Sequence, residues 1–153
     1  MPYKFEQLDV WKLSLEYIDS IYALAEKLPK SEEYNLKSQI IRAATSISLN
    51  IAEGSSGQSD AEQARFLGIA IRSLIETVAC HHIIQRRDYV QDENLLQKVY
   101  EDSQFLARKL QAFRKSLPNP QRQIREDIPT YGDEDLILGT ILSSIVNGLS
   151  SVW

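Results

Sequence analysis

The sequence has little cysteine, glycine and proline, and each shortage excludes a class of structure. Its 153 residues contain a single cysteine, Cys80, which rules out an internal disulfide and a cysteine-based zinc site. Six glycines and five prolines are too few for the many tight turns of an all-β sandwich. Hydrophobic residues make up 43% and charged residues 25%, close to average globular usage, so we expect one domain with a buried core.

The first residues lack the apolar run of a secretory signal, so we expect a cytoplasmic protein. The formal net charge of −4 argues against a generally basic nucleic-acid-binding protein, although it allows a local basic patch.

Four stretches with helical periodicity cover residues 8–118, at about 8–28, 32–53, 59–88 and 92–118. Several predicted boundaries have a capping residue: Ser31, Ser59 and Asp92 before the later helices, and Gly54 just after the second. The loops are short, as between antiparallel neighbours. The sequence therefore predicts an all-α protein, with an antiparallel up-down-up-down four-helix bundle over residues 5–118.

The third helix is apolar around well over half of its circumference. Its one polar stripe is narrow and consists of Arg65, Gly68, Arg72 and Glu76. A helix of this kind should be buried on more than one side, so we expect its second apolar side to face another subunit or a partner.

Beyond the bundle, a linker is expected at 119–135, followed by an extra amphipathic tail helix at 136–153 that carries no charge. Its apolar stripe runs from Leu138 to Val152 and is flanked by Trp153, and the candidate docking residues are Leu138, Leu142, Ile145, Leu149 and Trp153. Such a stripe is suited to docking into a groove on a partner protein, a neighbouring subunit or the chain's own bundle. A membrane surface is disfavoured, because helices that lie on lipid usually carry Lys and Arg on the polar face.

The residues offer little for catalysis. No Glu-x-x-His pair of a di-iron bundle is present. Cys80, His81 and His82 form the only cluster of soft ligands, but adjacent helical residues point about 100° apart and cannot all share one ion. Asn50 and Glu53 are read as structural, through hydrogen bonds across the bundle or a pair between Glu53 and Arg42 or Arg72. We therefore expect no enzyme activity, metal or cofactor.

A run without acids extends from Gln104 to Gln123. The cations of this region, the candidate nucleic-acid-binding residues, are Arg108, Lys109, Arg114, Lys115, Arg122 and Arg125. A charged helix face is often only solvated surface, but six cations together favour a phosphate-binding patch.

Residues 42–54, Arg-Ala-Ala-Thr-Ser-Ile-Ser-Leu-Asn-Ile-Ala-Glu-Gly, resemble the signature of a bacterial four-helix bundle family. Its members include the proteins encoded in intervening sequences of large ribosomal RNA genes and the accessory variability determinant (Avd) of diversity-generating retroelements. The segments Phe5-x-x-Leu-x-Val-Trp11 and Phe66-Leu-x-Ile-Ala-x-x-Ser-Leu-x-Glu76 agree with it. The structural signature residues are Arg42, Asn50, Glu53 and Gly54.

The resemblance implies a homopentameric ring of non-enzymatic bundles. By analogy with Avd, it also implies binding to RNA or DNA and to a reverse transcriptase. The alternative is a scaffold or adaptor that docks to a protein through the tail helix without binding nucleic acid.

Overall fold

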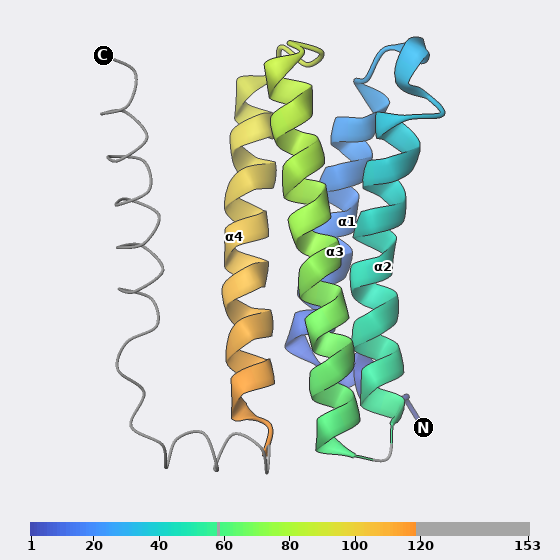
Figure 1. Cartoon of the computed structure of the whole chain (residues 1–153), viewed down its shortest axis with the longest axis vertical. Coiled ribbons are helices and arrows are strands. Elements are labelled where there is room, and N and C mark those ends of the chain that lie inside the picture. Colours follow the sequence, from blue (N-terminus) through green and yellow to red (C-terminus); the bar gives the residue numbers. More distant parts are fainter. Residues whose placement is uncertain (58, 119–153) are drawn as a thin grey trace, which may run out of the picture. The chain divides into compact units, whose positions relative to one another are not determined.

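The computed structural model describes residues 1–57 and 59–118, which form four long α-helices and two short 3-10 turns, Lys4–Gln7 and Lys30–Glu32. The helices are α1 (Asp9–Glu26), α2 (Leu36–Ser56), α3 (Asp60–Arg86) and α4 (Glu93–Ser116). Figure 1 shows that each helix runs opposite to the one before it. The expected all-α, up-down-up-down bundle is confirmed. The predicted linker at 119–135 and tail helix at 136–153 lie outside the described residues.

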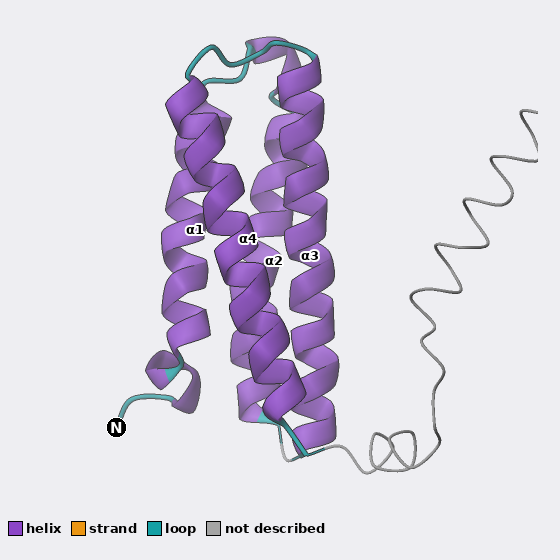
Figure 2. Cartoon of the chain, turned by 90° about the vertical axis from the view of Figure 1, so that its left-hand side faces the viewer, coloured by secondary structure: helices purple, strands orange, loops and turns teal. Residues whose placement is uncertain are grey.

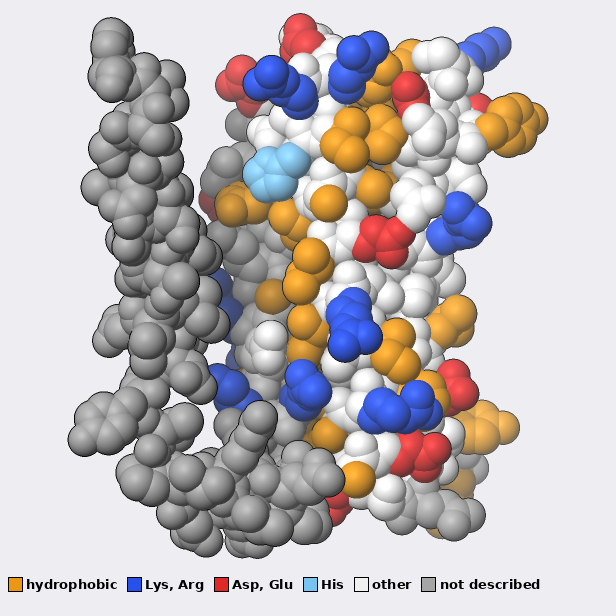
Figure 3. Space-filling view, in the orientation of Figure 1, with side chains coloured by type: hydrophobic (Ala, Val, Ile, Leu, Met, Phe, Trp, Pro, Cys, Tyr) orange, Lys and Arg blue, Asp and Glu red, His pale blue; other side chains and the backbone are white. Residues whose placement is uncertain are grey.

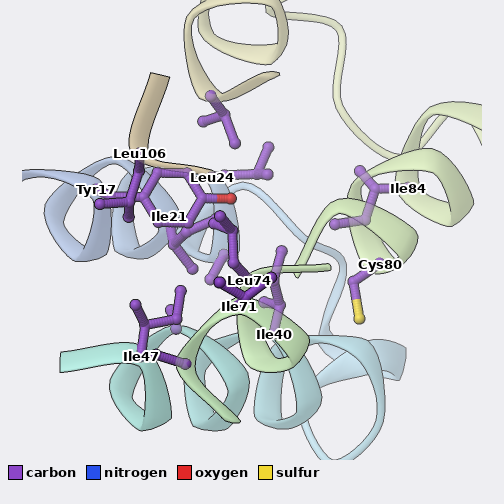
Figure 4. Close-up of a cluster of buried hydrophobic side chains, with 14 of the residues drawn as sticks. Tyr17, Ile21, Leu24, Ile40, Ile47, Ile71, Leu74, Cys80, Ile84 and Leu106 are labelled. Atoms are coloured by element: carbon purple, nitrogen blue, oxygen red, sulfur yellow. The ribbon is translucent and has the colours of Figure 1, made fainter. Parts of the chain in front are cut away.

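Each helix packs against its two neighbours around the bundle: α1 and α3 both lie beside α2 and α4. Figure 2 turns the molecule so that α1 and α4 can be seen side by side. Side chains from all four helices meet in the centre, where Ile21, Ile47, Leu74 and Leu106 are almost completely buried (Figure 4). This single core holds the surface residues of α3 and α4 on a rigid support.

Two of the predicted helix starts are confirmed, and one is wrong. Ser59 accepts a hydrogen bond from the backbone N–H of Glu62 at 3.2 Å, and Asp92 accepts one from Leu95 at 3.0 Å. Ser31, by contrast, lies in a 3-10 turn, and α2 begins at Leu36. The carboxylate of Glu32 caps α2 instead, because it accepts the Leu36 N–H at 3.3 Å. The same carboxylate accepts a hydrogen bond from the Tyr89 hydroxyl at 2.9 Å, a contact 57 residues away that local sequence does not reveal.

The predicted role of Gly54 as the residue just after α2 is also wrong. The helix continues to Ser56, and Gly54 is buried inside it. A Cβ atom at Gly54 would lie 2.7 Å from the Cβ of Phe66 on α3, which is closer than real Cβ contacts. Glycine is therefore required there by the close approach of α2 and α3 rather than by a left-handed turn.

Helix α3 is buried on one side and leaves apolar residues exposed on another, as expected for the isolated chain. Ile75 is 61% exposed and Ile83 47%, and Leu49 on α2 is 62% exposed. Among the described helices, α3 alone is long and apolar enough to cross a membrane, but half of its most apolar stretch is buried inside the bundle. A core helix has the same property, so we assign this apolar content to packing.

Candidate nucleic-acid interface

The second half of α4 carries four of the six predicted cations. Residues 103–116 contain Arg108, Lys109, Arg114 and Lys115 and no acid. Because successive residues turn by 100°, Arg108 and Lys115, seven apart, share one side of α4, and Arg114 and Lys109 lie on others. All four side chains are exposed. Arg122 and Arg125 lie outside the described residues.

Arg114 is turned toward α3. Its Nε donates a hydrogen bond to the carbonyl oxygen of Ala64 at 3.1 Å. A Cβ atom on Gly68 would lie 3.3 Å from the guanidinium carbon of Arg114. The guanidinium thus lies against the backbone of α3 at the one position of its polar stripe that has no side chain.

This contact joins the cations of α4 to two arginines that the sequence reasoning left out of the candidate site. Arg65 and Arg72 lie on either side of Gly68 along the same stripe of α3, and residues 63–75 contain no acid. Blue Lys and Arg side chains gather over the lower part of the α3–α4 face in Figure 3. We call this set of six exposed residues the basic face: Arg65, Arg72, Arg108, Lys109, Arg114 and Lys115.

Five of the cations of the basic face, Arg65, Arg72, Arg108, Lys109 and Arg114, form no ion pair with an acid of the described residues. The acids Asp92, Glu33 and Asp102 pair instead with Lys27, Lys37 and Lys98, which lie outside the basic face. Two aromatic rings lie among the cations. The Arg65 guanidinium is 4.4 Å from the centroid of the Phe66 ring, and the Lys109 ammonium is 5.4 Å from that of Phe105.

The Cys80-His81-His82 cluster does not form a reactive site. The His81 side chain is buried and its Nε2 lies 2.9 Å from the Leu96 carbonyl oxygen, whereas His82 is exposed. Burial raises the pKa of the Cys80 thiol, which opposes the thiolate that a nucleophile needs. No group of three or more metal-ligating side chains occurs in residues 1–57 and 59–118.

The other signature residues have structural contacts. Asn50 donates to the Ser46 carbonyl oxygen at 2.7 Å, so its hydrogen bond stays within α2 and does not cross the bundle. Arg42 donates to Gln39 Oε1 at 3.0 Å. Within the described part of the chain, the exposed Glu53 forms no ion pair, so the predicted pair with Arg42 or Arg72 is wrong.

The predicted docking residues of the tail, Leu138 to Trp153, fall outside the described part of the chain.

Only part of the basic face, its four cations on α4, was predicted from the sequence. Arg65 and Arg72 were missed because their stripe was judged as one face of α3 alone, although the absence of acids from residues 63–75 was a visible signal.

Comparisons with known proteins agree with this fold. The family model of the 23S rRNA-intervening sequence protein matches residues 6–119. A crystal structure from Bacteroides thetaiotaomicron, described as a protein of unknown function from the S23 ribosomal protein family, superimposes with a TM-score of 0.64. It is 30% identical in sequence, and the match covers 70% of this chain and 99% of that one. The comparison with curated proteins finds no significant match. The chain belongs to the 23S rRNA-intervening sequence protein family.

Proposed function

We propose that this protein is a non-enzymatic, self-associating helical bundle that binds nucleic acid through the basic face. One observation carries the proposal: Arg114 lies across Gly68 and joins two acid-free segments into a single surface with six cations. Such a surface attracts the phosphate backbone, and binding would release condensed counterions. The overall charge of −4 does not oppose this, because the charges near the binding surface determine the electrostatic potential that a bound nucleic-acid strand experiences.

A self-associated state would strengthen binding, since each copy adds a basic face and several faces can engage one strand. The exposed apolar residues Leu49, Ile75 and Ile83 support contact with a second copy. The resemblance to Avd adds a ring of five subunits and a reverse transcriptase partner to the proposal.

The test is binding of fluorescently labelled RNA and DNA at several salt concentrations, followed by fluorescence anisotropy. The triple variant Lys109→Glu, Arg114→Glu and Lys115→Glu should lose affinity by at least about 100-fold at low salt. It should also flatten the plot of log K against log salt, whose slope is about −0.7 per phosphate contact for single strands and −0.9 for duplexes.

The control is a second triple variant with the same change in net charge on exposed lysines outside the basic face: Lys4→Glu, Lys12→Glu and Lys30→Glu. It should bind nearly as the unmodified protein does. Absence of binding by the unmodified protein at low salt would refute the proposal and favour the scaffold alternative. An equal loss in both triple variants would show that only overall charge matters.

A further inference from the structure

A pocket of about 210 Å³ lies between α1 and α4, beside the basic face. Its walls include Leu13 and Glu16 from α1 and Asp102, Phe105 and Leu106 from α4. The two helices are neighbours in the bundle and are seen side by side in Figure 2. The pocket is too small for a helix or strand of a partner, but it is large enough for one flat ring.

The Phe105 side chain supplies an aromatic surface at this pocket. It is 44% exposed, although phenylalanine is usually buried. The Lys109 ammonium is 5.4 Å and the Arg108 guanidinium 6.0 Å from the centroid of its ring. A stacking surface next to two cations is the combination that single-strand binding proteins use, with a base on the ring and phosphates on the cations.

The polar wall of the pocket favours one chemical class of base. The Lys98 ammonium contacts Asp102 Oδ2 and, at 3.1 Å, Ser20 Oγ, so this oxygen of Asp102 is already engaged. The Glu16 carboxylate makes no hydrogen bond or ion pair with another described residue. A carboxylate accepts hydrogen bonds only, so it suits the exocyclic amino groups of adenine, cytosine and guanine, which uracil and thymine lack.

We propose that this pocket binds one unpaired, amino-bearing nucleobase of a single-stranded nucleic acid. The base stacks on Phe105, its amino group donates to Glu16, and the flanking phosphates contact Arg108 and Lys109. The inference rests on the proposed function and makes it more specific. In a duplex the bases are stacked on one another, so the pocket distinguishes single strands from duplexes.

The first experiment compares single strands and duplexes of about 12 nucleotides, a length within known single-strand site sizes. Phe105→Leu keeps an apolar side chain but removes the aromatic ring. It should weaken single-strand binding by about 5- to 150-fold, leave duplex binding unchanged and preserve the salt dependence, because no charge is removed. Phe105→Trp should retain binding.

The matched control is Tyr22→Leu, which removes an aromatic ring of α1 that is also 44% exposed and does not line the pocket. It should leave both affinities unchanged. Thermal unfolding of each variant, followed by circular dichroism, checks that the bundle is intact.

The second experiment tests the base. The unmodified protein should bind oligo(rA) and oligo(rC) more tightly than oligo(rU), and Glu16→Gln, whose amide also donates, should reduce this difference. If single strands bind but Phe105→Leu has no effect, or weakens duplexes equally, the pocket assignment is wrong and the basic face stands. If no nucleic acid binds, both proposals are wrong.

Discussion

The hydroxyl groups of Tyr17 and Thr77 lie 2.7 Å apart in the buried centre of the bundle, where they join α1 to α3. These two helices lie diagonally across the core and do not pack as neighbours. The Thr77 hydroxyl donates its one proton to the Leu74 carbonyl oxygen at 2.6 Å, so the Tyr17 hydroxyl is the donor to Thr77. This chain of two hydrogen bonds satisfies both polar groups inside an apolar core.

Removing the two partners of this pair should have unequal costs. Thr77→Val leaves the Tyr17 hydroxyl buried without an acceptor and should lower the free energy of unfolding by about 1–3 kcal/mol. Tyr17→Phe removes the donor and leaves Thr77 bonded to Leu74, so about 0.5–1.5 kcal/mol is expected. Urea unfolding of both single variants and the double variant gives the coupling energy. Fully additive costs would show that the pair contributes nothing as a pair.

Burial also predicts an alkaline transition. Desolvation is the largest cause that raises the pKa of Tyr17 to about 12, from an ordinary value of 10.0. The unfolded chain therefore loses this proton first, and the stability that the neutral phenol provides is complete below pH 10 and lost as the pH rises toward 12. The free energy of unfolding of Tyr17→Phe should fall less steeply with pH over this range than that of the unmodified protein. The loss attributable to Tyr17 is on the order of 2–3 kcal/mol. Identical alkaline profiles of the two proteins would contradict the assignment.

His81 predicts an acid transition of the opposite sign. Burial lowers its pKa below 6.5, and its Nδ1 has no hydrogen-bond partner among the residues that the structure describes. The unfolded chain takes up the proton first, so stability is complete above about pH 6.5 and falls as the pH drops below it. Between neutral and mildly acidic pH, the urea midpoint of unfolding should fall less for His81→Phe than for the unmodified protein.

Gly54 and Gly57 form a matched pair for the contact between α2 and α3. A Cβ atom at Gly54 would lie 2.7 Å from Phe66 Cβ, so Gly54→Ala must push the helices apart and should cost about 1–3 kcal/mol. A Cβ atom at Gly57 would meet the flexible carboxylate end of Glu62 and lie 3.3 Å from the backbone carbonyl oxygen of Gly54, and the φ of Gly57 is −67°. Gly57→Ala should therefore cost less than Gly54→Ala, because the Glu62 side chain can move away and the contact with the Gly54 oxygen needs only a small adjustment. Thermal unfolding of the two variants checks the order.

Self-association should depend on the exposed apolar residues of α3. Ile75→Arg places a charge where the side chain is 61% exposed in the single chain, so folding should be retained while a buried interface would be disrupted. Light scattering should give a lower mass for this variant than for the unmodified protein. Leu15→Arg, on α1, is the control and should keep the original mass. Unchanged mass of Ile75→Arg would place any interface elsewhere.

The sequence was sufficient for the helices because their apolar residues recur with helical spacing over long stretches. It was also sufficient for the caps, because Ser59 and Asp92 accept hydrogen bonds from backbone N–H groups only three residues further along the chain. It failed at Ser31 and Gly54 because the contacts of Glu32 with Tyr89 and of Gly54 with Phe66 join segments that only the fold brings together. The same limit explains why Arg65 and Arg72 were not assigned to the site, since only packing places α4 beside them.

The position of Arg114 also has an entropic consequence. Arginine and lysine side chains each carry about 2 kcal/mol of rotamer entropy, and a mobile side chain loses part of it when a phosphate binds. Arg114 is already ordered by its hydrogen bond to Ala64, so most of its rotamer entropy is lost on folding rather than on binding a ligand. If the basic face binds nucleic acid as proposed, Gly68 contributes to affinity without any functional group, because a Cβ atom at this position would lie 3.3 Å from the guanidinium carbon and force Arg114 to shift.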